Sequence, residues 1–181
     1  MRFDKLNEEV FLAIDSIVKI ERSEIENLKN RSKSNKRKRI RFCAHKSIEN
    51  NLHEMFIVHT NDTYVRPHKH LNKDESLHII EGLVDIIIFK DDGDIINVIQ
   101  MGDYLSGKKF YLRMSDSYYH SMIIRSEFLV FHEVTTGPFR KSDTVFPAWS
   151  PDEEDYNATR KFRTKLADSA ISFISKDKEG D

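Results

Sequence analysis

The stretch Pro67-His68-Lys69-His70-Leu71-Asn72-Lys73-Asp74-Glu75, followed by Gly82, carries the most specific pattern in this chain of 181 residues. It reads H-x-H, then four residues and E, then six residues and G. Residues two apart on a β-strand point to the same face, ~6.6 Å apart along the strand, so both imidazoles can reach one ion. Two histidines and a carboxylate suit divalent first-row metals and leave coordination positions open. The spacing therefore predicts a metal site on His68, His70 and Glu75.

A fourth ligand is expected from a distant strand, and His120 is the best candidate. It lies in YYHSMIIR (118–125), which follows Gly102 and a turn at Ser115-Asp116-Ser117. The alternative is that His68 and His70 are exposed polar residues at the end of a strand.

Short β-rich runs separated by turn residues extend from about Leu52 to Phe146. Asp91-Asp92-Gly93 joins two of these runs and is the strongest hairpin signal in the chain. Many short strands without helical connectors predict a β-sandwich or a small barrel rather than a parallel sheet. The runs are MFIVH, TYVRPHKH, SLHIIEG, LVDIIIFK, DIINVIQ, KKFYLRM, YHSMIIR and FLVFHEVT.

Helical patterns flank this β-rich region. Leu6, Val10, Ile14, Ile17 and Val18 recur at steps of three and four, which predicts an amphipathic helix, and a second short helix is expected from Ser23. At the other end, Ser150-Pro151-Asp152-Glu153-Glu154 predicts a helix N-terminus. The helix that follows is expected to present a rough apolar face to the barrel or to a sister subunit, formed by Tyr156, Phe162, Leu166, Ile171, Phe173 and Ile174.

One block of positive charge lies between residues 29 and 46, which hold nine basic residues and no acidic one. Such a block is either a solvated linker or a contact for phosphate, the latter only if the segment folds over a pocket. The basic residues are Lys29, Arg31, Lys33, Lys36, Arg37, Lys38, Arg39, Arg41 and Lys46.

The two metal-ligand motifs match the pattern of the cupin superfamily, in which one motif carries H-x-H, Glu and Gly and a second carries a single His. More narrowly, RFCAH, HEMFIVH, TYVRPHKHLNKDESLHIIEG, GDYLSG, the YYH run and FHEVTTGPFRKSDTVFPAW resemble the WbuC family of cupin-fold metalloproteins. The resemblance covers roughly residues 37 to 150. It implies a mainly β fold, a cupin-type double-stranded β-helix or jelly-roll barrel, with the metal at its mouth and with flanking N- and C-terminal helices. By matching positions it implies His68, His70, Glu75 and His120 as ligands, and genes of the family are associated with bacterial surface-polysaccharide synthesis.

The chain departs from the general cupin pattern at three places: Asp62 stands where the first motif usually opens with Gly, the PxG before His120 is missing, and Ile124 replaces the usual Asn. The expected organisation is a helical and basic extension over residues 1–46, the cupin barrel over 47–149, and a C-terminal helix and tail over 150–181.

Other residues near the motif are candidates for the pocket. Tyr64 and Arg66 share parity with His68 and His70, so a regular strand would point them into the same cavity, where Arg66 could hold a carboxylate or phosphate. The alternative is that Tyr64 only packs the barrel. Alternation turns His78 to the opposite face from Glu75. We expect the remaining histidines to be satisfied or on the surface: His45, His53, His59, His78 and His132.

Composition excludes several classes of protein. Lys and Arg number 29 against 30 Asp and Glu, a formal charge of −1, which gives no support to nucleic-acid binding. The longest apolar runs are far below the ~18 residues of a membrane span. The single cysteine, Cys43, cannot form an internal disulfide and is expected to be an inert buried thiol. A cytoplasmic protein that forms a homodimer is the expectation.

The leading functional hypothesis is an enzyme that uses one divalent ion, Fe, Mn, Ni or Zn, on a small polar metabolite such as a sugar, phosphorylated sugar or nucleotide-sugar. Isomerisation, epimerisation or lyase chemistry would fit, and an Fe(II) dioxygenase is an alternative. A second hypothesis is a non-catalytic module whose metal stabilises the barrel or serves sensing. A metal-free sugar isomerase of the same shape conflicts with the intact ligand set.

Overall fold

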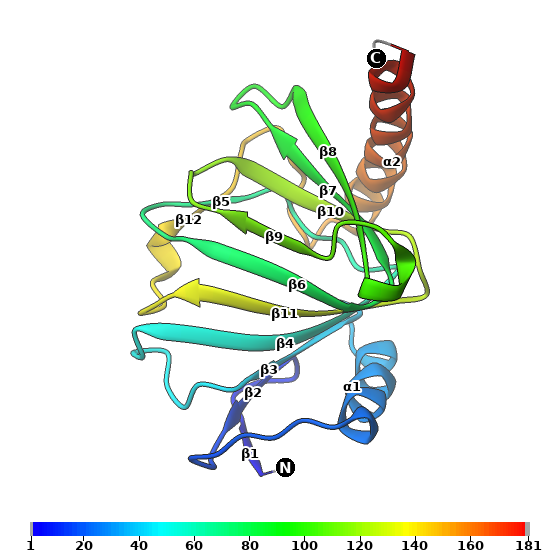
Figure 1. The fold of residues 1–181 in the computed structure, drawn as a ribbon. Coiled ribbons are helices and arrows are strands. Elements are labelled where there is room, and N and C mark those ends of the chain that lie inside the picture. Colours follow the sequence, from blue (N-terminus) through cyan, green and yellow to red (C-terminus); the bar gives the residue numbers. More distant parts are fainter. Residues whose placement is uncertain (1, 180–181) are drawn as a thin grey trace.

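The computed structural model describes residues 2–179, in which two helices flank two facing β-sheets (Figure 1). The residues 180–181 of the expected C-terminal tail lie outside the described part. The larger sheet has the strand order β1-β2-β3-β4-β11-β6-β9, and a smaller sheet has the order β10-β7-β8. The strands of the larger sheet are β1 (Phe3–Lys5), β2 (Val10–Ala13), β3 (Arg39–Cys43), β4 (Leu52–Thr60), β6 (Glu75–Glu81), β9 (Tyr111–Met114) and β11 (Phe128–Thr136). Those of the smaller sheet are β7 (Leu83–Phe89), β8 (Ile95–Gly102) and β10 (Tyr119–Ile124).

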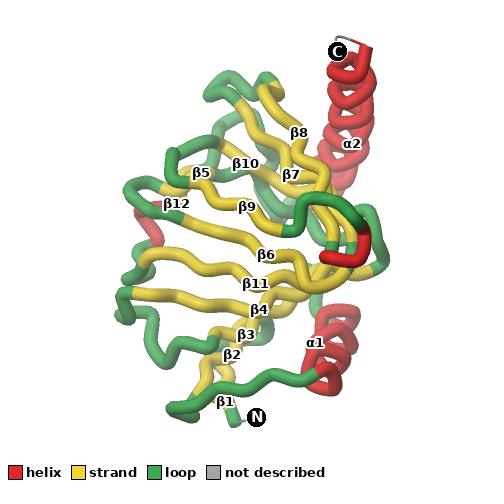
Figure 2. Tube along the Cα trace, viewed as in Figure 1, coloured by secondary structure: helices red, strands yellow, loops and turns green. Residues whose placement is uncertain are grey.

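The strand order from β4 to β11 is that of a jelly roll, because the chain crosses repeatedly between two facing layers and only the β7–β8 hairpin stays within one layer (Figure 2). One layer is β4-β11-β6-β9. The other is β10-β7-β8 extended by the short strand β5 (Lys69–His70), which also pairs with β12 (Thr144–Val145). His68, just before β5, forms the bridge to His120 of β10. The predicted mainly β jelly-roll barrel of the cupin type, with a helix at each end, is confirmed.

The barrel interior is filled by side chains that alternate along each strand. Ile57 of β4 lies opposite Phe131 of β11, and Met55 of β4 and Leu77 of β6 flank the next inward position of β11. All four side chains are buried in one apolar cluster. Complete burial of such side chains contributes about 1.5–3 kcal/mol each. This cluster fills much of the interior between the two sheets.

The expected amphipathic helix over residues 6–18 is wrong. β1 and β2 form an antiparallel hairpin instead. The Asn7 side chain starts the turn, because its oxygen accepts hydrogen bonds from the backbone N–H groups of Glu9 at 2.8 Å and Val10 at 3.0 Å. Val18 follows the hairpin in an irregular segment.

Consecutive apolar residues in β2 explain why a strand forms there. Phe11 and Ala13 pack beneath the first helix, while Val10 and Leu12 pack against the interior cluster. A strand covered on both faces reads as a continuous apolar run, and β2 pairs in parallel with β3, which is remote in sequence. The spacing of apolar residues alone cannot distinguish a strand covered on both faces from an amphipathic helix.

The helix expected from Ser23 is confirmed as α1 (Arg22–Ser34), although its N-cap is Glu21, which forms a capping box with Glu24. Ile25 and Leu28 bury its inner face against the outer side of β3 and β4. The basic segment 29–46 is not a solvated linker, since it forms the end of α1, a turn and β3.

The C-terminal helix α2 (Tyr156–Glu179) begins six residues later than its expected start at Ser150. Asp155 caps it, because its side chain accepts a hydrogen bond from the Ala158 N–H at 2.9 Å. Phe162 and Leu166 pack on the outer face of the smaller sheet, whereas Tyr156 and Ile171 of the expected apolar face are exposed. In the described chain, neither helix offers an apolar stretch long enough to cross a membrane.

The hairpin predicted at Asp91-Asp92-Gly93 connects β7 to β8. Gly93 has a φ of 96°, the left-handed region that glycine adopts without strain. Short 3-10 helices at Tyr104–Ser106 and Lys141–Asp143 complete the described elements.

Candidate metal centre

Three histidines from two neighbouring segments meet at the open end of the barrel. His70 lies in β5, His68 directly precedes β5, and His120 lies in β10. One ring nitrogen from each histidine lies within 4.8 Å of those of the other two. The backbones of His68 and His120 hold each other in place, because each N–H donates to the other's carbonyl, at 3.1 and 2.9 Å.

Glu75, the first residue of β6, joins the three histidines from the opposite sheet. Its Oε1 lies 3.0 Å from Nε2 of His120, and its Oε2 lies 3.6 Å from Nε2 of His70. The carboxylate is buried, with 7% of the residue exposed. The structure thus brings together all four residues expected as ligands.

The hydrogen bonds of the rings show which nitrogens face the centre. Nδ1 of His68 lies 2.7 Å from the carbonyl oxygen of Arg66, and Nδ1 of His120 lies 3.1 Å from that of Tyr118. A carbonyl only accepts, so Nδ1 carries the proton in both rings and the lone pair of Nε2 faces the centre. Nδ1 of His70 contacts the hydroxyl of Thr144 at 3.2 Å. Metal-bound histidines are oriented by hydrogen bonds of this kind.

Burial keeps the three imidazoles neutral at neutral pH. It lowers the pKa of His68 to about 3 and those of His70 and His120 to about 4. Burial also raises the pKa of Glu75 to about 8, with a further contribution from the nearby carboxyl of Glu133. A protonated Glu75 can donate to the lone pair of His120, and a cation would take the place of that proton.

The turn between His70 and Glu75 is held from three sides. Asn72 adopts a left-handed conformation with a φ of 56°, which asparagine tolerates. The Lys73 ammonium donates to the carbonyls of Thr136 at 3.0 Å and Pro138 at 2.7 Å. The Ser117 hydroxyl donates to the carbonyl of His70 at 2.6 Å. These contacts show that the fold itself holds the turn in place. The donor set, three histidines and one carboxylate, fits a divalent ion.

Strand alternation predicts that Tyr64 and Arg66 point into the same cavity as His68 and His70. In the structure they do not. Val65 between them is buried in the interior cluster, and three residues later His68 also faces inward, so the alternation slips at Pro67. The segment has no regular strand before the bridge at His68. Tyr64 and Arg66 therefore point to the outside of the barrel.

The outward side chains contact the segment that precedes α2. The Tyr64 hydroxyl donates to the carbonyl of Pro151 at 3.0 Å, and its ring packs edge-on against Phe162. The Arg66 guanidinium donates to the Ser150 hydroxyl at 3.2 Å and to the carboxylate of Asp152 at 2.6 Å. Their role in the described geometry is to hold this segment against the barrel.

The remaining histidines divide into two groups. His78 is exposed on the outer face, as predicted. His53 and His59 are buried on the inward face of β4, and His53 Nε2 and His59 Nδ1 have no hydrogen-bond partner among the described residues. Alternation with Met55 and Ile57 is the signal that could have placed them inside. Cys43 is a free buried thiol, as expected, and burial raises its pKa to about 11.

Sequence reasoning also missed two charged residues on inward faces. Glu133 lies on β11 directly between Leu77 and Met55, and Arg41 lies on β3 opposite Ile57. Their neighbours on both sides in the sheet belong to the interior cluster. Once the pairing of β3, β4 and β11 is known, the alternation of side chains along FLVFHEVT and RIRFC indicates that Glu133 and Arg41 face inward.

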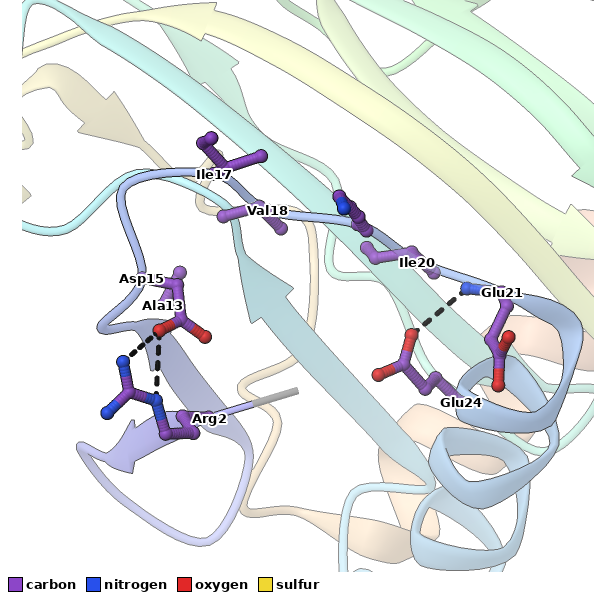
Figure 3. A pocket seen from close by; sticks show the side chains of 9 residues that line it. Arg2, Ala13, Asp15, Ile17, Val18, Ile20, Glu21 and Glu24 are labelled. Atoms are coloured by element: carbon purple, nitrogen blue, oxygen red, sulfur yellow. Dashed lines mark hydrogen bonds and ion pairs between the residues drawn. The ribbon is translucent and has the colours of Figure 1, made fainter.

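Two pockets outside the barrel offer less chemistry. One, of about 410 Å³, lies beside the start of α1 (Figure 3), where Arg2 and Asp15 are hydrogen-bonded to each other. The other, of about 800 Å³, lies along α2, where Arg163 donates to two loop carbonyls and Arg37 pairs with Glu153. In both pockets these cations are already paired or hydrogen-bonded.

Comparison with protein-family models matches residues 20–101 to a domain of unknown function, DUF6016. The matched range contains His68, His70 and Glu75 and ends before His120. A search among curated proteins found no match.

Several solved structures have a similar fold. Protein SO0799 from Shewanella oneidensis is 12% identical over 59% of this chain and 72% of its own, with a TM-score of 0.49. The capsular polysaccharide assembling protein CapF from Staphylococcus aureus is 16% identical over 55% of this chain and 27% of its own, with a TM-score of 0.45. Oxalate decarboxylase from Bacillus subtilis, described with Mn(II) centres, is 16% identical over 54% of this chain and 24% of its own, with a TM-score of 0.43.

This chain thus spans about a quarter of the length of CapF and of oxalate decarboxylase. The assignment of a cupin-type jelly roll rests on the strand order of the two sheets.

Proposed function

We propose that the protein is a divalent-metal-binding cupin that acts as an enzyme on a small polar metabolite, a sugar or nucleotide-sugar of surface-polysaccharide synthesis. The convergence of His68, His70, His120 and Glu75 on one point supports the metal site. The link to polysaccharide synthesis rests on the resemblance to the WbuC family alone.

The ligand set suits an ion that keeps open positions. His68, His70, Glu75 and His120 would hold the ion, and a donor set of this kind would leave room for water or substrate beside it. When bound, such an ion supplies Lewis-acid chemistry, because it polarises a carbonyl or hydroxyl oxygen. Isomerisation, epimerisation and lyase reactions all begin with that polarisation and with a proton transfer.

A group for the proton transfer is present in the same interior. Glu133 is half-buried on β11 and forms no hydrogen bond or ion pair among the described residues. Burial raises its pKa, and the positive charge of Arg41 opposes that rise. A buried carboxyl without a hydrogen-bond partner is a candidate for this proton transfer, which favours an enzyme over a purely structural metal site.

The metal site is tested by elemental analysis of the native protein beside three variants, with metal content normalised to protein concentration. We expect near one divalent ion per chain in the native protein and a loss of metal in both His68→Ala/His70→Ala and His120→Ala. His78→Ala is the matched control, since this histidine is exposed on the outer face. Full metal content in the ligand variants, or no metal in the native protein, would overturn the metal site.

The reaction class is tested by a screen of polysaccharide precursors with the metal-loaded protein, with and without oxygen. Turnover without oxygen is expected for an isomerase, epimerase or lyase. Turnover only in air would point to an Fe(II) dioxygenase, because the open site then activates oxygen. No turnover of any precursor in either condition would count against the sugar assignment.

A further inference from the structure

Arg41 faces the interior of the barrel. In the antiparallel pair of β3 and β4, Arg41 lies opposite Ile57 and Cys43 lies opposite Met55. Residues opposite each other in a sheet point to the same face, and Ile57, Met55 and Cys43 all belong to the interior cluster. The side chains of the alternate residues Ile40 and Phe42 lie in the outer cluster beneath α1. Strand geometry therefore directs the guanidinium of Arg41 inward.

In the described part of the chain Arg41 forms no direct ion pair, unlike its neighbours Arg37 and Arg39, although its charge acts on the carboxyl groups of Glu9 and Glu133. Arg37 and Arg39 both form ion pairs with Glu9 and Glu153. Within residues 2–179, the Arg41 side chain forms no hydrogen bond and no ion pair, although it is only half-exposed. Half-buried charges are normally paired, so an inward guanidinium without a partner indicates a place for an anion from outside the chain.

Two further polar side chains lie on the same interior face. His59, two residues after Ile57 in β4, is 6% exposed, and its Nδ1 has no hydrogen-bond partner. Glu133 lies on β11, two strands from β3, a lateral separation of roughly 10 Å. The charge of Arg41 adds to the effect of burial that lowers the pKa of His59, and it opposes the effect of burial that raises the pKa of Glu133, which is consistent with a common interior.

Glu133 lies between Arg41 and the metal ligands. Along the larger sheet, Arg41 is level with Phe131, Glu133 is one inward position further on, and Glu75 is level with Thr135. A ligand that reaches from Arg41 to the four-residue cluster would therefore pass Glu133.

The charges of this interior favour a carboxylate over a phosphate. A guanidinium binds a carboxylate with two parallel hydrogen bonds and balances its single charge. A phosphate dianion would bring a second negative charge next to Glu133, and the ammonium of Lys73, the lysine that acts on His70 and His53, is held by Asp143 and by two backbone carbonyls. His59 adds a neutral ring nitrogen rather than a charge.

We propose that Arg41 binds the carboxylate of the substrate, a hydroxy acid or sugar acid whose neighbouring hydroxyl or carbonyl oxygen faces the cluster of His68, His70 and His120. This inference rests on the proposed metal site and narrows its substrate class. It also assigns a role to the one arginine of residues 37–41 that the fold leaves without an acidic partner.

The test uses the full chain loaded with Co²⁺ and titrated by calorimetry with glycolate, ethylene glycol and inorganic phosphate. Glycolate carries a carboxylate beside a hydroxyl, and ethylene glycol lacks the charge. We expect Arg41→Gln to weaken glycolate binding by roughly tenfold or more, with unchanged metal content and unchanged binding of ethylene glycol. Arg39→Gln is the matched control, because it removes the same charge from the same strand at a residue held by Glu9 and Glu153.

Arg41→Lys is the second variant, which keeps the charge and loses the planar fork, and an intermediate affinity for glycolate is expected. Equal affinity of the native protein and both Arg41 variants would overturn the inference. Arg41-dependent binding of phosphate in preference to glycolate would overturn the choice of a carboxylate.

A titration of chelator-treated, metal-free protein separates the two proposals. If the native protein holds no metal, the proposed function fails, and the Arg41-dependent affinity for glycolate in metal-free protein still decides the inference. If metal binds as proposed but glycolate affinity does not depend on Arg41, the inference alone fails.

Discussion

His59 differs from the three clustered histidines because one of its ring nitrogens has no partner in the described structure. The ring packs edge-on against Phe131, with centroids 5.4 Å apart. Burial, with a smaller contribution from the charge of Arg41, lowers the pKa of His59 to about 3. An unfolded histidine has a pKa of ~6.5. The residue therefore makes folding depend on pH.

Between pH 6.5 and 3 only the unfolded chain protonates residue 59, so acid removes stability that is fully present above pH 6.5. Each pH unit is worth ~1.4 kcal/mol for one group. We expect the loss in free energy of unfolding between pH 7 and pH 5 to be smaller by about 2 kcal/mol in His59→Leu than in the native protein. Urea unfolding at the two pH values measures it. An identical loss in both proteins would show that His59 titrates normally in the folded state.

At the scale of single residues, the sequence predicts the clustering of the four candidate ligands well and the rest of the pocket poorly. His68, His70 and Glu75 lie within eight residues, so one local motif contains their geometry. Arg41 and Glu133 reach the same interior from strands far apart in the chain, and only the pairing of β3, β4 and β11 brings them there. Pro67 shifts the alternation, which turns Arg66 outward against the prediction.

Among the elements, the turn between β6 and β7 depends on Gly82, the last residue of the sequence motif. Its φ is 97°, and a Cβ at this position would lie 2.2 Å from the carbonyl oxygen of Phe128. The neighbouring atom is backbone and cannot yield easily. This glycine thus serves the fold at the far end of β6 from Glu75, rather than the metal directly.

We expect Gly82→Ala to lower the free energy of unfolding by roughly 3 kcal/mol, from backbone strain and the clash together. Gly107→Ala is the matched control. It also has a positive φ, 70°, but no atom lies within 4 Å of its added Cβ, so a loss of about 1 kcal/mol is expected. Denaturant unfolding of both variants measures the difference. Equal losses would mean that the contact with Phe128 relaxes at no cost.

The N-terminal elements show where local patterns fail. Apolar steps of three and four predicted a helix over residues 6–18, yet β2 forms because β3 and the two layers on its faces cover every one of its side chains. α1 was predictable because its capping signal and apolar face are local. The late start of α2 follows from Ser150, whose hydroxyl donates to the Pro147 carbonyl instead of capping a helix.

For the whole molecule, the many short strands and turns predict a barrel. They do not predict that residues 1–46 add strands to its larger sheet. Residues 1–46 contribute β1, β2 and β3 to the larger sheet, and α1 covers the outer side of β3 and β4. The division at residue 46 remains a prediction, as do the homodimer and the cytoplasmic location.

A chain shortened to residues 47–181 tests this division. The shortened chain lacks the residues that cover the fully buried Val58 and Val130, and it leaves the edge of β4 unpaired. Exposed apolar surface and a free strand edge both promote association, so we expect the shortened chain to aggregate. A chain that starts at residue 7 and loses only the outermost strand β1 should remain soluble. Solubility and circular dichroism of both chains decide, and a folded, monodisperse 47–181 would show that the barrel is independent.

The reciprocal backbone hydrogen bonds between His68 and His120 have one further consequence. They set the separation of the two backbones before any ion arrives, and the bonds from each Nδ1 to a backbone carbonyl orient the rings, so an ion of larger radius would have to disturb these ring bonds to spread the imidazoles. A flexible oxygen cage adapts to the size of its cation, but this pair does not. Discrimination among cations would then follow from ionic radius and from the stiffness of the β5–β10 junction, more than from the chemical identity of the donors.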